Sequence, residues 1–403
     1  MNSGIGMDAL SERDVRRNAL VLSCAQALGG ANPAIVISLG GLVGQALATD
    51  KALATLPVSL YNLGLALGTI PAAMLMRRLG RRAAYIVGAL VGAVAGCLAA
   101  YSITGSLFAL FCLATAIAGV YGSCVQSYRF GATDGATPEF RARAISWVMV
   151  GGLAGSVIGP QTVIWTRDAI AGVPFAGSFF SQAVLALLAI PVLLMMRGAV
   201  RPAAERGGGR PLREIVLTQR FVVAVAAGIV SFGMMSFVMT AAPIAMVACG
   251  HTVGEAALGI QWHVLAMFAP SFFTGRLIAR YGKEVVTIVG LLLMGVSGAV
   301  ALSGLGVAHF WGSLVFLGVG WNFGFIGATA LVTDCYRPEE RTRVQAVNDF
   351  LVFGSVALAS FSSGRLLNAA GWETINWLLY PAIAIALLPL LWQMRATPRP
   401  AQG

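Results

Sequence analysis

The sequence predicts an all-helical membrane protein whose twelve transmembrane helices form two six-helix bundles, and three observations lead to that fold. Of the 403 residues, 58% are hydrophobic and 11% are charged, and the mean hydropathy is +0.80. A soluble chain carries about 25% charged residues, so most of this surface faces lipid. The apolar residues also fall in runs of membrane-spanning length, and the two halves of the chain share a repeated pattern.

Charged residues and clusters of glycine and proline delimit the predicted spans. Crossing the hydrocarbon core takes about 20 apolar residues. In the first half, such runs lie near 19-46, 52-76, 83-104, 105-128, 144-166 and 170-196. In the second half, they lie near 221-249, 256-279, 285-306, 308-332, 346-367 and 374-394. We therefore expect one bundle at 1-196 and another at 221-403, joined by a cytoplasmic connector at 197-220.

The basic residues predict the orientation. If both termini are cytoplasmic, only Lys51, Arg167 and Arg365 lie in outer loops, as the positive-inside rule requires. The net charge of +11 is spread over short clusters between apolar runs, so no nucleic acid partner is expected. Residues 1-17 lack the short apolar stretch of a cleaved signal peptide, and none is predicted. The chain should be a multi-pass protein in contact with membrane lipids.

A repeated motif relates the two halves. Residues Thr133-Asp134, Pro138-Glu139, Arg141 and Arg143 recur, at one constant offset, as Thr333-Asp334, Pro338-Glu339, Arg341 and Arg343. The loop Arg78-Leu79-Gly80-Arg81 is matched by Arg280-Tyr281-Gly282-Lys283. Two halves of equal orientation form a parallel repeat. Over nearly the whole chain, this pattern resembles the major facilitator superfamily, which implies a carrier that works by alternating access.

The repeated loops are candidate gates at the inner mouth. Their cations can form charge-assisted hydrogen bonds with the nearby acids and hold one conformation. The candidate residues are Arg78, Gly80, Arg81, Asp134, Arg143, Arg280, Gly282, Lys283, Asp334 and Arg343. Simple topology anchoring is the alternative, because positive loops occur in every such protein. The family usually carries an acid before the first arginine, where this sequence has Arg77 and Ala279.

Polar side chains within the spans are few. Asp349, near the start of span 11, is either a proton-coupling site or a partner for Arg341 or Arg343. The amides either line a solute cavity or hydrogen-bond neighbouring helices, and they are Gln26, Asn32, Asn62, Gln126, Gln161 and Asn322.

Spans 7 and 8 carry a distinctive set of side chains. Met235 and Met239 stand four apart on one span, and His263 and Met267 stand four apart on the next. Residues at this spacing share a helical face, and Met239 and Met267 both lie roughly 15–18 Å below the outer helix ends. Thioethers suit Cu(I) and serve poorly for Mg²⁺ or Ca²⁺. Ordinary core packing by methionine is the alternative.

The same four residues resemble the paired motifs of the CcoA-type copper importers, a branch of the superfamily. The resemblance implies Met235, Met239, His263 and Met267 as ligands of copper, which would be the substrate, with no permanently bound cofactor. Cys249 and Met246 are candidates for copper capture at the outer end. The resemblance to these importers also implies copper import across the bacterial cytoplasmic membrane for cytochrome oxidase assembly. Its further implications are copper donors and acceptors as partners and a monomeric protein.

The residues also bear on three other functions. A proton-coupled carrier or exporter of a small organic solute, such as a vitamin, amino acid or drug, would use the amides with Trp321 or Tyr128. Gly155-x-x-x-Gly159-Pro160 is similar to an exporter motif but incomplete, and close helix packing explains it better. A metal sensor would need a signalling domain. An enzyme is not expected, because three scattered histidines build no catalytic constellation.

Overall fold

The computed structural model describes residues 11–197 and 209–396. Within these ranges the chain is helical, joined by turns and short loops, and contains no strand. The helices of the first half are α1 (Glu12–Gly29), α2 (Ala31–Leu47), α3 (Leu56–Leu79), α4 (Arg81–Thr104), α5 (Phe108–Gln126), α6 (Tyr128–Gly131), α7 (Pro138–Thr166) and α8 (Ala176–Leu194). A short 3₁₀ turn, η1 (Lys51–Leu53), precedes α3.

The second half begins with a short helix and continues with long ones. These helices are α9 (Leu212–Val216), α10 (Gln219–Ala248), α11 (Val253–Phe268), α12 (Ser271–Tyr281), α13 (Lys283–Leu302), α14 (Val307–Thr333), α15 (Arg341–Trp377) and α16 (Leu379–Ala396). A second 3₁₀ turn, η2 (Pro338–Glu340), leads into α15.

The described helices occupy the twelve places of the predicted spans. Ten segments are long and apolar enough to cross a membrane, and α11 with α12 forms one more span that is bent by 42°. The shorter apolar helix Leu379–Met394 takes the last place. The boundaries differ most from the expectation at two spans. The first span is interrupted at Gly30, between α1 and α2, and span 11 runs on to Trp377 through a kink at Gly371.

Two glycines make the tight turns of the repeated loops. Gly80 joins α3 to α4 at a φ of +83°, and Gly282 joins α12 to α13 at +92°. Glycine adopts this backbone conformation without the steric cost that a Cβ would bring. The matching geometry places Arg81 and Lys283 at the first position of the following helix in each half.

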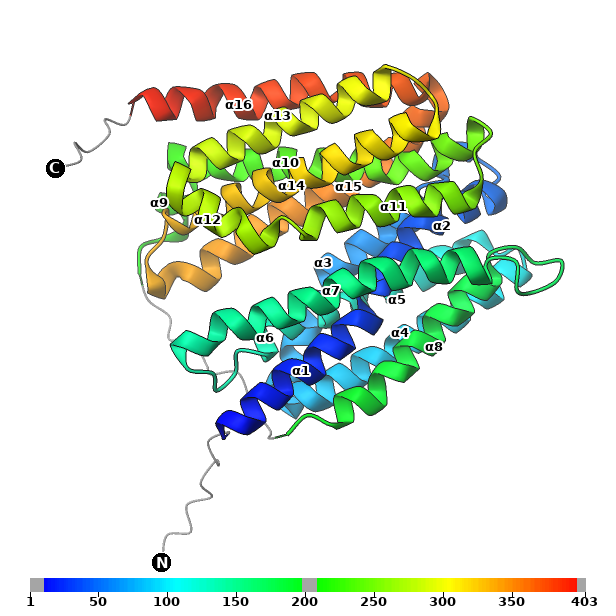
Figure 1. Ribbon diagram of the computed structural model, residues 1–403, viewed down its shortest axis with the longest axis horizontal. Helices are drawn as coiled ribbons and strands as arrows, with labels where there is room; N and C mark the ends of the chain where they lie inside the picture. The colour runs from blue at the N-terminus through cyan, green and yellow to red at the C-terminus, as the bar shows by residue number, and fades with distance from the viewer. Residues whose placement is uncertain (1–10, 198–208, 397–403) are drawn as a thin grey trace, which may run out of the picture.

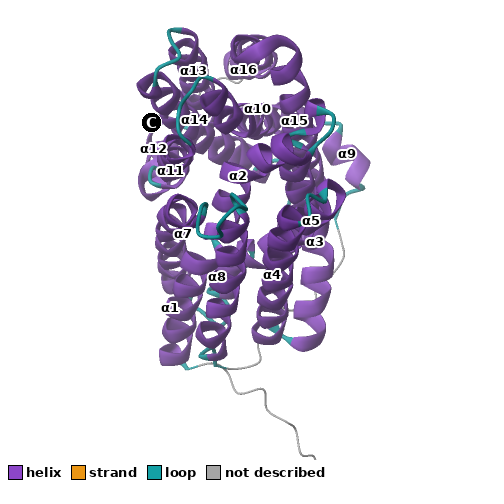
Figure 2. Ribbon diagram, turned by 90° about the vertical axis from the view of Figure 1, so that its right-hand side faces the viewer, coloured by secondary structure: helices purple, strands orange, loops and turns teal. Residues whose placement is uncertain are grey.

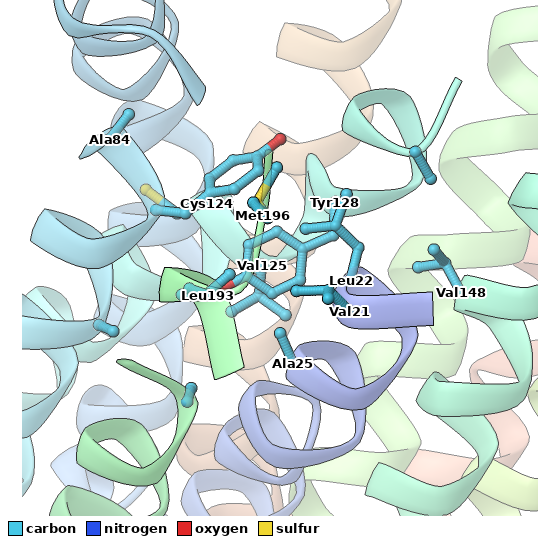
Figure 3. Close-up of a cluster of buried hydrophobic side chains, with 14 of the residues drawn as sticks. Val21, Leu22, Ala25, Ala84, Cys124, Val125, Tyr128, Val148, Leu193 and Met196 are labelled. Atoms are coloured by element: carbon cyan, nitrogen blue, oxygen red, sulfur yellow. The ribbon is translucent and has the colours of Figure 1, made fainter. Parts of the chain in front are cut away.

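Figures 1 and 2 show the two sets of helices side by side, with α1–α8 in one group and α10–α16 in the other. Figure 3 shows the core of the first group, where Leu22, Val125, Tyr128 and Leu193 converge from α1, α5, α6 and α8. Small residues let the helix backbones approach closely. A Cβ on Gly96 of α4, for example, would lie 2.7 Å from the backbone nitrogen of Ala183 on α8.

Candidate functional site

The two groups of helices meet along a polar seam. Helices α2, α3 and α7 of the first group contact α10, α11 and α15 of the second. Across the seam, Gln161 Nε2 donates to Gln261 Oε1 at 3.0 Å, and Asn62 Nδ2 donates to Ser360 Oγ at 3.2 Å.

These contacts lie toward the face where α2 ends and α3 begins. There, Gly364 N donates to Thr55 Oγ1 at 3.2 Å. Toward the other face, where α1 begins and α12 ends, the two groups diverge in Figure 1. The amides of Asn62 and Gln161, expected either to line a cavity or to bind neighbouring helices, thus join the two halves at the seam.

An aromatic cluster lies in the second group, beside the seam. Trp321 and Phe325, one turn apart on α14, stack with ring centroids 5.3 Å apart. Phe232 of α10 meets Trp321 edge-on at 5.3 Å, and Phe268 of α11 does so at 6.2 Å. Phe353 of α15 contacts Phe232 at 5.7 Å and packs against the core formed with α2 and α3. The cluster therefore reaches from the second bundle to the first.

Asn322 fixes the backbone beside this cluster. Its amide donates to the Met267 carbonyl at 2.6 Å and to Ser271 Oγ at 2.7 Å, and its oxygen accepts from Thr274 Oγ1 at 2.6 Å. These bonds bridge the break between α11 and α12, where Pro270 leaves backbone groups without helical partners. The neighbouring Trp321 therefore lies on a segment that these three hydrogen bonds join to α11 and α12.

Trp321 carries an unused hydrogen-bond donor. Its side chain is 8% exposed, and its Nε1 has no acceptor among the described residues. Leaving a buried N–H unpaired is costly in an apolar setting. The surrounding Phe232, Phe268, Phe325 and Phe353 are each partly exposed. The phenylalanines thus present flat apolar surfaces beside a buried, unpaired donor, and this combination suits a planar aromatic solute that has carbonyl or ring-nitrogen acceptors.

The four predicted copper ligands are buried in the same half. Met235, Met239 and Met267 share one apolar cluster and are 1%, 6% and 7% exposed. His263 is fully buried, and its Nδ1 lies 2.7 Å from the Leu314 carbonyl of α14. The predicted capture residues separate, because Cys249 is exposed whereas Met246 is fully buried.

The predicted gate residues form two ion-pair clusters. In the first half, Arg81 binds the Asp134 carboxylate through two nitrogens, one of them at 3.0 Å from Oδ1. In the second half, Asp334 binds Lys283 and also Arg220, whose Nη2 is 3.0 Å from Oδ2. The structure thus pairs the two repeated acids with cations of their own half.

The other gate residues and Asp349 lie on exposed surface. Arg78, Arg143 and Arg343 are exposed, and Arg280 stacks on Tyr281, 5.2 Å from the ring centroid. Asp349 is exposed near the start of α15 and accepts a bond from Asn348 Nδ2 at 3.0 Å. Arg129 of α6, in the other half, also acts on it electrostatically.

Fold and site together define a multi-pass membrane carrier with a seam between two helical bundles. The model of the Major Facilitator Superfamily matches residues 20–270 and 224–403. The chain belongs to this superfamily and is a transporter rather than an enzyme, and the predicted all-helical, twelve-span fold is confirmed.

Relatives of this chain include two bacterial transporters and one solved structure. The riboflavin transporter RfnT of Brucella anthropi is 63% identical over 383 residues, which cover 94% of this chain and 96% of that one. The uncharacterized MFS-type transporter YdeG of Bacillus subtilis is 31% identical over 398 residues, covering 93% and 91%. The nucleoside transporter NupG matches with a TM-score of 0.73 at 12% identity, covering 94% of this chain and 100% of that one.

The prediction of copper transport is wrong, because a relative of this identity and coverage carries a vitamin. The predictions of copper as the substrate and of copper donors and acceptors as partners are therefore also wrong. The spacing of the methionines does not distinguish a metal site from a packed core. Methionines four apart on adjacent helices also fill an apolar core, where these three side chains are placed. The organic-solute alternative agrees better with the relative.

Most of the aromatic cluster is not predicted from the sequence. Trp321 and Asn322 are among the residues expected for an organic solute, but Phe232, Phe268, Phe325 and Phe353 are not. One local signal was available, since Trp321 and Phe325 share a helical face by their spacing. The other three rings come from α10, α11 and α15, and only tertiary packing brings them together.

Proposed function

We propose that this chain transports riboflavin, or a flavin with the same isoalloxazine ring, across the bacterial cytoplasmic membrane. The observation that carries the proposal is the 63% identity to a riboflavin transporter along 94% of the chain. The aromatic cluster supports it independently of that likeness. Isoalloxazine is flat and aromatic, and its carbonyl oxygens and ring nitrogens accept hydrogen bonds.

In the proposed complex, the ring system packs against the faces of Trp321 and its phenylalanine neighbours, and a flavin acceptor takes the Trp321 Nε1 hydrogen. Stacking on aromatic side chains is worth about 1–3 kcal/mol per base in nucleic acid binding, and isoalloxazine is at least as large. The ribityl hydroxyls face the amide-rich seam around Asn62, Gln161 and Gln261. The five rings of the cluster carry no charge, in keeping with a neutral vitamin.

We further propose that residues 1-196 and 221-403 move as two bodies about the seam, with 197-220 as the connector and both chain ends cytoplasmic. Contacts between the groups come from α2, α3 and α7 on one side and from α10, α11 and α15 on the other. The Arg81–Asp134 and Lys283–Asp334 pairs would brace the loops that meet when the diverging face closes. The transporter would act as a monomer, and Asp349 stays a candidate coupling residue.

Growth of a bacterial strain that can neither make nor import riboflavin tests the proposal. Expression of the native chain should restore growth at low external riboflavin, and Trp321→Ala should not. Trp392→Leu is the matched control, because Trp392 is 59% exposed on α16, outside the cluster. Failure of the native chain to restore growth, with the protein present in the membrane, would contradict import of riboflavin.

A further inference from the structure

A groove opens on the outer flank of the first bundle, away from the seam. It lies between the beginning of α1 and the end of α8, which are side by side in Figure 2, and it has a volume of about 570 Å³. Arg13, Arg17 and Arg197 line it together with apolar side chains that include Leu20, Val192 and Met195. The groove shares no residue with the proposed flavin site.

One face of α1 changes from basic to apolar along the groove. Arg13, Arg17 and Leu20 stand at positions i, i+4 and i+7, so they form one stripe. At 1.5 Å per residue, Leu20 lies about 10 Å from Arg13 and about 5 Å from Arg17 along the axis. The headgroup layer on each side of a bilayer is about 5–7 Å thick. The stripe therefore matches the step from phosphate level to acyl-chain level.

Three guanidinium groups face one carboxylate in the groove. Arg197 Nη1 lies 3.7 Å from Asp14 Oδ1, and the Arg197 side chain keeps 62% of its surface exposed. Arg17 Nε donates to the Met195 carbonyl at 3.1 Å, which ties α1 to the end of α8. Arg13 forms no hydrogen bond or ion pair within the described residues. Positive charge is thus left over for an anion.

The lower part of the groove is apolar and open to the side. Leu20 and Met195 are large apolar side chains that are 54% and 52% exposed. An acyl chain can pack against these two side chains below the arginines, and a free phosphate ion offers no such apolar contact. Basic pockets between spans, at the level of the headgroups, are typical binding sites for anionic lipids.

We propose that this groove binds one anionic phospholipid, with its phosphate between Arg13, Arg17 and Arg197 and an acyl chain along Leu20, Val192 and Met195. Bound there, the lipid joins the beginning of α1 to the end of α8. It thereby supports the first bundle beside the point where the connector leaves.

The test measures binding of short-chain lipids to the purified full-length protein by the shift in its melting temperature. Dioctanoyl phosphatidylglycerol should stabilise the protein saturably, whereas dioctanoyl phosphatidylcholine and sn-glycerol 3-phosphate should not. The double variant R13Q/R17Q should bind phosphatidylglycerol about thirtyfold more weakly, given about 1 kcal/mol per arginine near a membrane surface.

Two further variants keep the outcome interpretable. R77Q/R82Q removes the same charge from exposed positions at another loop, and it should bind phosphatidylglycerol as the native chain does. Leu20→Asn leaves the arginines in place and should weaken phosphatidylglycerol binding several-fold, even if R13Q/R17Q fails to fold. Equal stabilisation by phosphatidylcholine would overturn the proposal. So would equal stabilisation by glycerol phosphate, or unchanged affinity in both R13Q/R17Q and Leu20→Asn.

Discussion

Tyr121 and Trp321 occupy corresponding positions in the two halves, since each precedes the repeated Thr-Asp pair by the same distance. Tyr121 is 1% exposed and packs into the space left by Gly88 and Gly92 on α4. Trp321 instead contacts three partly exposed phenylalanines beside the seam, stacking on Phe325 and meeting Phe232 and Phe268 edge-on. Both side chains are buried, but the first half packs this position within its own bundle, whereas the second half places it in the aromatic cluster of the proposed flavin site.

A second pair of positions shows the same divergence. Phe140 and Glu340 each follow the repeated Pro-Glu pair. Phe140 meets Trp147 edge-on at 5.4 Å, and it packs within the first bundle. Glu340 is fully buried and accepts hydrogen bonds from Arg210 N, Nε and Nη2 at 2.8–2.9 Å, as well as from Arg337 N. The second half uses this position to anchor the connector.

Truncation of Tyr121, which packs the core of the first bundle, should have the largest effect on stability. Tyr121→Ala leaves a cavity against Gly92, and it should lower the free energy of unfolding by about 3 kcal/mol or more. Trp321→Ala should cost less stability, because the rings around Trp321 are partly exposed. Melting temperatures of the two purified variants in one detergent check this order. If the melting temperature of Trp321→Ala fell as much as that of Tyr121→Ala or more, the two positions would not differ in their contribution to stability.

Truncation of Trp321 should mainly weaken the binding of the proposed substrate. Trp321→Ala should weaken riboflavin binding tenfold or more, because it removes a stacking surface. Trp321→Phe keeps a ring but lacks the indole N–H, and it should give an intermediate affinity. Quenching of flavin fluorescence on titration with purified protein measures the riboflavin affinity of both variants. Native affinity in Trp321→Ala would place the vitamin elsewhere.

Much of the fold follows from sequence, and the site follows only in part. Apolar runs and the repeated Thr-Asp and Gly-Arg motifs locate the helices, because lipid forces each span to satisfy its own backbone. The break at Pro270 and its repair by Asn322 require contacts between α11, α12 and α14 that no local pattern encodes. The spacing of Met235 and Met239 also fits two opposite roles, a metal site and a packed core.

The two ion-pair clusters should differ in their tolerance to mutation. Among the residues that the structure describes, Asp134 forms an ion pair with Arg81, whereas Asp334 forms ion pairs with both Lys283 and Arg220. Arg81→Gln should therefore slow uptake several-fold, and Lys283→Gln should slow it less. The double variant K283Q/R220Q should match Arg81→Gln. Initial rates of riboflavin uptake, measured at equal amounts of each variant in the membrane, test this order. If Lys283→Gln alone slowed uptake more than Arg81→Gln does, Arg220 would not compensate for the loss of Lys283.

The smallest effect concerns pH at the connector anchor. Hydrogen bonds from Arg210 hold the pKa of the Glu340 carboxyl well below its usual range. Because the pKa is depressed, the ionised Glu340 carboxyl stabilises the folded chain fully at a pH above its pKa in the unfolded chain, about 4.3. This stabilisation is lost as the pH falls through the pKa in the folded chain.

Cleavage of the connector by a protease that is active in acid should therefore stay constant from pH 7 to about 5 and rise only below about 4. Glu340→Gln should be cleaved faster than the native chain at pH 7, and its cleavage should vary less with pH. A native chain already loosened near pH 6 would contradict the assignment.

Uptake of labelled riboflavin into proteoliposomes that contain only the purified chain tests the transport proposal most directly. Saturable, time-dependent entry above that of empty liposomes is expected, with strong reduction in Trp321→Ala and none in Trp392→Leu. Folded native protein that admits no riboflavin in either orientation, with or without a proton gradient, would contradict the account.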